Sequence, residues 1–276
     1  MKITLPIHTV KVLVKRDLFS ALRGSGLYVV SSVLFLSAAF IVKNYLDSIK
    51  KNDVFVSHNP LSSAFSIPMV IVSVYLALVS AASISREKDQ GTLEVLFYGP
   101  VSYFSYVIGK YINGMLNYLV VVVFFFIYFL GISNLTNLGF SYRLVEAIFM
   151  SLFSVSCVIS FGLLISSFTR RIRSSILWLV GILLLFLGIQ LSHTILLGMP
   201  ETTMSSVLVY FEKSLSMISR YVIGWLSPFS YVTRGMEAVS MGDLKSYGMN
   251  IIYCIIYSVV SLSLSMFILE KKGVRG

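Results

Sequence analysis

The chain has 276 residues, of which 57% are hydrophobic and 12% are charged. An ordinary soluble domain carries about 25% charged residues, so this composition argues against a water-soluble globule, a disordered chain or a disulfide-stapled domain. The net charge of +10 is spread between apolar stretches and forms no single basic face, so nucleic acid is not an expected partner.

The N-terminal segment 8–23 is too short and too charged to cross a membrane, but its apolar residues recur at helical spacing. Arg16 and Arg23 lie on the opposite face, whereas Asp17 falls on the apolar side. We expect a helix that lies flat in the membrane interface. The alternative is a basic juxtamembrane stretch that is merely attracted to anionic headgroups.

Six continuous apolar stretches are long enough for a helix to cross a hydrocarbon core of about 30 Å. They cover residues 26–42, 64–84, 111–130, 144–168, 176–197 and 249–269. Residues 119–126 are apolar at every position, which is not the alternation of a barrel strand. The expected fold is therefore all-α: a single polytopic membrane domain over 1–276 with six transmembrane helices.

Lysine and arginine counts predict the orientation. With six spans both termini lie on the same side, and placing them inside puts 14 of the 22 Lys and Arg residues in the cytoplasm. We therefore expect a multi-pass protein of the cell membrane with both termini cytoplasmic.

The span 64–84 carries Ser73, Ala77 and Ala81 at intervals of four residues, a strip of small side chains that lets a second helix approach closely. Such a strip fits either internal packing or a pathway or subunit interface. Both alternatives stay open at the level of the sequence.

The spans are almost free of ionisable residues, which disfavours an ion-driven carrier or an embedded enzyme. Glu146 follows Arg143 by three residues at the outer boundary of its span, where an interfacial ion pair is expected rather than a proton relay. Asn113, Asn117 and Gln190 are expected to form interhelical hydrogen bonds.

Enzyme signatures are missing from the sequence. It contains no HExxH, GxSxG or CxxC motif and no complete phosphate-binding loop, so the chain is not expected to be an enzyme or to hydrolyse ATP by itself. His8, His58 and His193 do not form a spaced metal-ligand set. We expect no metal and no bound cofactor on this chain.

The inner connection 85–110 has the pattern of a helix held between two turns. Its charged residues 86–89 continue the preceding span, Gly91 ends that helix, 92–98 can form a short helix, and 99–100 force a turn. Leu93, Val95, Leu96 and Phe97 are expected to supply an apolar docking surface, with Glu94 as a charged contact. The alternative is an interfacial linker lying on the headgroups.

The outer connection 198–248 is too apolar for a solvated loop. Pro228 favours a helix start and Gly242 a helix stop, so two short helices are expected near the outer leaflet or packed on the bundle, with 229–241 as the second. The alternative is an amphipathic hairpin on the outer surface without a role in a pathway.

At the inner connection the chain resembles the type-2 family of ATP-binding cassette (ABC) exporter permeases. That family typically shows an E-x-x-x-GTLE-x-L stretch, then a proline turn, then a Gly-Lys pair. The matching residues here are Glu87, 91–94, Leu96, Pro100, Gly109 and Lys110. A second, weaker similarity is the stretch 226–237, which contains Ser-Pro, Tyr and Arg before the last span.

The resemblance implies a permease without its own ATPase domain. It implies dimerisation with a second copy or a paralogous permease, and a separate nucleotide-binding ATPase subunit that carries ATP and Mg. Glu87 would brace its span against Arg16 or Arg23, and the strip of Ser73, Ala77 and Ala81 could face the pathway or the dimer interface. The implied coupling residues are Glu87, Gly91, Thr92, Leu93, Glu94, Leu96 and Phe97.

Two other functions stay open. One is a membrane-anchored assembly or immunity protein that holds an ATPase without moving substrate, and the other is an ion-driven carrier. Among cargoes, drugs, lipids, peptides, polysaccharides and ions all remain compatible with the sequence.

Overall fold

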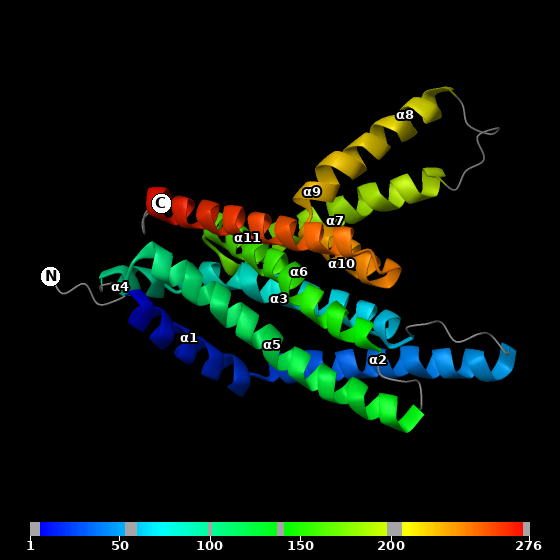
Figure 1. Ribbon diagram of the computed structural model, residues 1–276. Coiled ribbons are helices and arrows are strands. Elements are labelled where there is room, and N and C mark those ends of the chain that lie inside the picture. The colour runs from blue at the N-terminus through cyan, green and yellow to red at the C-terminus, as the bar shows by residue number, and fades with distance from the viewer. Residues whose placement is uncertain (1–5, 53–59, 99–100, 137–140, 198–205, 273–276) are drawn as a thin grey trace.

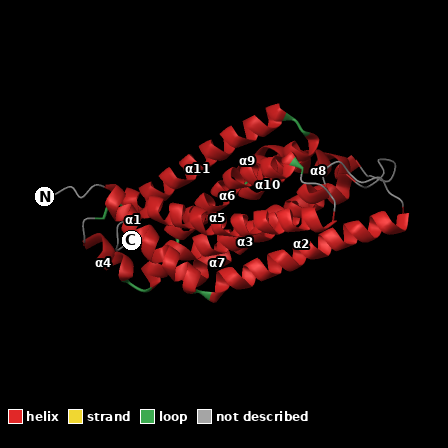
Figure 2. Ribbon diagram, turned by 60° about the horizontal axis from the view of Figure 1, so that its bottom comes forward, coloured by secondary structure: helices red, strands yellow, loops and turns green. Residues whose placement is uncertain are grey.

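The computed structural model describes residues 6–52, 60–98, 101–136, 141–197 and 206–272. Within these ranges the regular elements are all helices, joined by short loops (Figure 2). In chain order they are α1 (Pro6–Arg23), α2 (Ser25–Asn52), α3 (Pro60–Asp89), α4 (Thr92–Tyr98), α5 (Tyr103–Thr136), α6 (Tyr142–Phe168), α7 (Ile172–Leu197), α8 (Ser206–Met217), the π-helix η2 (Ile218–Ile223), α9 (Gly224–Leu226), α10 (Pro228–Met241) and α11 (Leu244–Lys272).

Six of these helices, α2, α3, α5, α6, α7 and α11, are long and apolar enough to cross a membrane. Each of the six expected spans lies within one of them. The all-α fold with six candidate spans is therefore confirmed. The interfacial position of α1 and the position of the short helices at the outer leaflet stay predictions.

The helix α6 lies at the centre of the bundle and packs most extensively on α3 and α11, and then on α10 (Figure 1). In the most apolar segment of α6 most residues are buried, whereas most of α7 is exposed. The far half of α7 leans away from the bundle together with α8 (Figure 1). The exposed side chains of α7 are mainly apolar, as expected of a helix that faces lipid or another protein chain.

The strip of Ser73, Ala77 and Ala81 is completely buried inside the chain. A Cβ atom on Gly162 of α6 would lie 2.7 Å from Ser80 Cβ and 2.8 Å from Ala77 O, so the backbones of α3 and α6 approach too closely there for any residue except glycine. Of the two alternatives, the structure therefore supports internal packing. A role of this strip in a pathway or a dimer interface stays a prediction.

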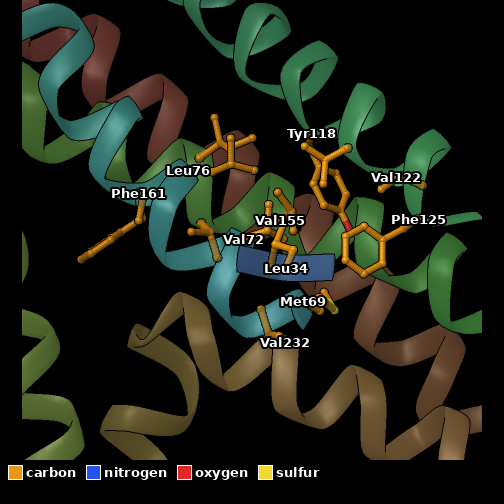
Figure 3. Packing of buried hydrophobic residues seen from close by; sticks show 14 of the residues in the cluster. Leu34, Met69, Val72, Leu76, Tyr118, Val122, Phe125, Val155, Phe161 and Val232 are labelled. Atoms are coloured by element: carbon orange, nitrogen blue, oxygen red, sulfur yellow. The ribbon is translucent and has the colours of Figure 1, made fainter. Parts of the chain in front are cut away.

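A second part of the core joins α2, α3 and α5. Figure 3 shows Leu34 from α2 meeting Met69 and Val72 from α3 and Phe125 from α5. Phe35 of α2 stacks on Phe125 with ring centroids 5.1 Å apart. These contacts hold α2 to the bundle although much of its surface is exposed.

The predicted short helix 229–241 is present as α10, which begins at Pro228 and packs against α6 and α11. It ends at Gly242, whose φ of 71° is the left-handed conformation that glycine tolerates best. Residues 198–205 of the same connection lie outside the described ranges, as do 99–100 of the inner connection.

Candidate functional site

Four charged side chains from three helices meet beside α4. Lys110 Nζ of α5 lies 2.7 Å from Asp17 Oδ2 of α1 and 2.6 Å from Glu87 Oε1 of α3. Arg16 Nη2 lies 2.9 Å from the same Glu87 oxygen, and Arg16 Nε lies 2.8 Å from Asp17 Oδ1. We call Arg16, Asp17, Glu87 and Lys110 the charge cluster. It links α1 to both α3 and α5.

The charge cluster is largely shielded from solvent. The side chains of Lys110, Glu87 and Asp17 are 9%, 14% and 15% exposed, whereas that of Arg16 is 51% exposed. The hydroxyl of the fully buried Tyr106 donates a hydrogen bond of 2.7 Å to Glu87 Oε2. Two cations thus balance two carboxylates, which offsets the cost of removing them from water.

Arg16 remains charged in this setting. Partial burial lowers the pKa of its guanidinium, but hydrogen bonds to Asp17 and Glu87 and their negative charges outweigh that effect and raise the pKa above its ordinary value. The contact between Glu87 and Arg16 that the resemblance implied is present. Arg23 lies in the last turn of α1, is exposed, and does not belong to the cluster.

The Gly-Lys pair at the start of α5 contributes to the same contact. Leu13 of α1 is buried over Gly109, its Cβ 3.5 Å from the position that a Cβ on the glycine would take. Lys110 follows directly and reaches the two carboxylates. The pair therefore places an apolar and an ionic contact side by side between α1 and α5.

The short helix α4 is oriented differently from the expectation. Leu93 is 3% exposed, and Phe97 packs on the rings of Tyr103 and Tyr106 at centroid distances of 4.5 and 5.5 Å. Leu93 thus faces the core, and Leu96 and Phe97 are partly buried against it, because large apolar side chains are stabilised by burial. The burial of Leu93 is a correction to its expected place on a docking surface, whereas the coupling role of α4 stays a prediction.

The exposed face of α4 carries different residues. Val95 is 72% exposed and Tyr98 is 83% exposed, and Thr92 and Glu94 are exposed as well. Gly91, with a φ of 68°, makes the turn from α3 into α4, and Thr92 Oγ1 donates a hydrogen bond to Glu87 O at 3.2 Å. We call Thr92, Glu94, Val95 and Tyr98 the α4 outer face.

Two serines from neighbouring helices, Ser166 and Ser175, bind the end of α3 nearest α4 to α6 and α7. Ser166 Oγ of α6 accepts hydrogen bonds from the backbone N–H groups of Ile84 (3.0 Å) and Ser85 (2.8 Å). Ala81 O accepts from Ser85 Oγ at 3.0 Å and from Ser175 Oγ of α7 at 2.6 Å. We call Ser85, Ser166 and Ser175 the serine junction. Side chains that bond to a helix backbone in this way mark a place where the helix can bend.

Lys88 adds a further link at this end of the bundle. Its Nζ donates to Ser167 O at 2.6 Å and to Thr169 O at 3.3 Å. These carbonyls lie at the C-terminal end of α6, where a cation is favourable because the helix dipole is negative there. The ends of α3 and α6 are therefore held together by a charged side chain as well as by the serines.

The predicted ion pair between Arg143 and Glu146 is wrong. Arg143 Nη1 instead donates to Ser240 O at 2.9 Å, and Glu146 accepts a hydrogen bond from the hydroxyl of Tyr142. Spacing along α6 allowed the pair, but the end of α10 offers Arg143 a carbonyl that the sequence could not place.

The predicted interhelical hydrogen bonds are also not found. The side-chain oxygens of Asn113 and Asn117 are buried and have no partner within the described part of the chain. Gln190 is exposed on α7. These three residues therefore do not join helices through the contacts that were expected of them.

Sequence reasoning missed Asp17 and Tyr106 as members of the site and missed the serine junction altogether. The signal for Asp17 was its place on the apolar side of α1, where a carboxylate needs a partner. Serines inside spans carry no comparable signal, because most of them bond within their own helix.

The geometry defines a class: a polytopic α-helical membrane protein whose spans carry, at one end, a charge cluster and a short helix with an exposed face. A family model described as ABC-2 family transporter protein matches residues 12–274. The chain belongs to this family, whose members are membrane permeases of ABC transporters that work with a partner ATPase subunit and are not themselves ATPases. A search of curated proteins finds no match.

Proposed function

We propose that the chain is the permease subunit of an ATP-driven exporter in the cell membrane, with both termini in the cytoplasm. It pairs with a second copy or a paralogous permease, and the α4 outer face receives a separate nucleotide-binding ATPase. ATP and Mg bind to that partner, and this chain carries no cofactor. The observation that carries the proposal is the charge cluster, which ties α1, α3 and α5 together directly beside α4.

The contacts of α4 support a route for mechanical coupling. Leu93 and Phe97 seat α4 on the bundle, and Phe97 packs on α5. Closure of two ATPases on ATP would press the paired α4 helices together, and the charge cluster would make α1, α3 and α5 move as one body. The serine junction passes the movement from α3 to α6 and α7, which turns the pathway from inward-facing to outward-facing.

The test is co-purification from the native host in mild detergent. Wild-type chain should retain a soluble P-loop ATPase in a complex of two permeases and two ATPases. Val95→Asp should lose the ATPase while the chain stays folded, because Val95 is exposed and makes no core contact. Val95→Thr, which keeps the shape without the charge, is the matched control and should retain it.

Four results would contradict the proposal. Folded Val95→Asp chain that retains the ATPase would show that the α4 outer face is not the docking surface. Wild-type chain that purifies alone, or transport in vesicles driven by an ion gradient without ATP, would favour a carrier. An ATPase complex without any transport would favour the assembly or immunity function.

A further inference from the structure

A cavity of about 150 Å³, lined by both polar and apolar side chains, lies at the end of the bundle opposite α4. It is formed where α6 begins, α10 ends and α11 begins. The polar residues that line it are Tyr142, Arg143, Glu146, Asp243 and Tyr247, and Gly242 forms part of its wall. The cavity is remote from the charge cluster and from α4, so the proposed docking of an ATPase does not use it.

The cavity holds a cation and a carboxylate that do not pair with each other. Arg143 lies over Gly242, where a Cβ would come within 3.0 Å of Nη2, and uses Nη1 for Ser240 O. Glu146 uses Oε1 to accept from Tyr142, and no ion pair joins it to Arg143 in the part of the chain that the structure describes. A guanidinium has five N–H donors and a carboxylate two oxygens, so both groups keep capacity for a ligand.

The other carboxylate at the cavity is already used. Asp243 Oδ1 accepts from the N–H of Lys245 at 3.0 Å and Oδ2 accepts from Ser246 Oγ at 2.6 Å. These hydrogen bonds, of which the one from Ser246 has the largest effect, hold the pKa of Asp243 below its ordinary value. The carboxyl group therefore stays ionised as the cap of α11. Glu146 is therefore the carboxylate that can receive a ligand, and Arg143 is the cation.

The position of the cavity points to a lipid. Two candidate spans, α6 and α11, begin here, which places the cavity at the level of the headgroups. Tyr142 is 67% exposed beside it, in keeping with the tyrosines that line membrane interfaces. Along α6 the exposed side chains of Val145 and Phe149 continue toward the membrane centre and offer an apolar surface for acyl chains.

We infer that this cavity binds the headgroup of a zwitterionic phospholipid that carries a primary ammonium group, of the phosphatidylethanolamine class. Arg143 receives the phosphate, because a guanidinium donates several hydrogen bonds to such oxygens. Glu146 receives the ammonium. A choline headgroup has no N–H to donate to Glu146, and a glycerol headgroup has no cation, so both bind less well.

The test is native mass spectrometry of the full chain, purified in detergent and mixed with equal amounts of phosphatidylethanolamine and phosphatidylglycerol with the same acyl chains. Wild-type chain should form the ethanolamine adduct in clear excess. Glu146→Gln should lower the ethanolamine-to-glycerol adduct ratio roughly tenfold, because it removes a charge-assisted hydrogen bond. Its amide oxygen can still accept from Tyr142, so folding is preserved.

Glu237→Gln is the matched control, because Glu237 is exposed on α10 and does not line the cavity. It should keep the wild-type adduct ratio. Equal ratios in wild-type chain and Glu146→Gln would overturn the proposal. Displacement of the lipid adduct by an equal concentration of soluble phosphoethanolamine would overturn the assignment to a lipid, since it would show that the free headgroup alone is the ligand.

Discussion

The two ends of the bundle use charge in opposite ways. Beside α4, Glu87 accepts from Lys110, Arg16 and Tyr106, which come from two other helices. At the opposite end, Arg143 and Glu146 lie three residues apart on one helix and do not pair. The first arrangement cross-links helices, and the second leaves charged groups facing a cavity.

The difference follows from what each carboxylate can reach. Glu87 is shielded and would be costly if left alone, so its partners are fixed from several directions. Glu146 is only partly buried, so water can hydrate it and no second helix must supply a cation. Paired, shielded charges thus contribute to the structure, whereas partly hydrated ones stay available for binding. Variants at the α4 end should change global stability, and variants at the other end should change occupancy.

The largest expected effect is at Lys110. Lys110→Met removes the cation that joins Asp17 and Glu87 and leaves two shielded carboxylates with Arg16 alone, which should lower the free energy of unfolding by about 3–4 kcal/mol. Unfolding of the purified chain by SDS in mixed micelles measures this. Lys15 is exposed on α1, next to Arg16 in the sequence, so Lys15→Met should change the free energy of unfolding little. Equal losses in both variants would show that the charge cluster does not stabilise the bundle.

The next effect is at Gly162, which brings α3 and α6 together between the two ends. Gly162→Ala places a Cβ 2.7 Å from Ser80 Cβ and should cost about 2–3 kcal/mol through overpacking, measured in the same titration. Gly188→Ala is the control, since nothing lies within 4 Å of a Cβ at that position of α7. If Gly162→Ala lowers the free energy of unfolding no more than Gly188→Ala, α3 and α6 can move apart without losing stability. That result would contradict the interpretation that the two helices form a single core.

The sequence predicted the helices well because apolar length and glycine or proline breaks are local signals. Gly91 and Gly242 end helices as expected, and each has a positive φ. The direction in which side chains point around a helix was harder to predict. In α4, with only seven residues, the apolar positions gave no indication of which ones face the core, so the buried Leu93 was assigned to the docking surface together with the partly buried Leu96 and Phe97.

The charged contacts depend on tertiary placement in the same way. The Arg16 contact was available from family resemblance, but Asp17 meets Lys110 only where α1 packs on α5, and Tyr106 meets Glu87 only where α5 packs on α3. Arg143 and Glu146 have the spacing of an ion pair, yet α10 offers Arg143 a carbonyl that is distant in the sequence. Spacing within one helix therefore predicts which groups could meet, and the neighbouring helices decide which of them do.

Gly91 and Gly242, which are both in the left-handed conformation, give a third comparison between the ends. Gly91→Ala should lower the free energy of unfolding by about 1 kcal/mol through the positive φ alone, because nothing lies within 4 Å of the position of its Cβ. Gly242→Ala meets the same cost and also places its Cβ 3.0 Å from Arg143 Nη2, so about 2 kcal/mol is expected. SDS unfolding measures both losses. Gly242→Ala alone should also change the lipid adduct ratio, and an equal change in Gly91→Ala would contradict the separation of the two ends.

The smallest effect concerns the serine junction. Ser166→Ala removes the acceptor of the Ile84 and Ser85 N–H groups and should cost about 1 kcal/mol, because two buried donors lose a partner from α6. Ser167→Ala is the matched control, since Ser167 Oγ bonds only to Leu164 O within its own helix. Hydrogen exchange at the Ile84 and Ser85 amides should accelerate in the first variant and stay unchanged in the second. If both amides exchange as in wild-type chain after Ser166→Ala, the backbone of α3 needs no support from α6, and the serine junction would not carry movement from α4 to the rest of the bundle.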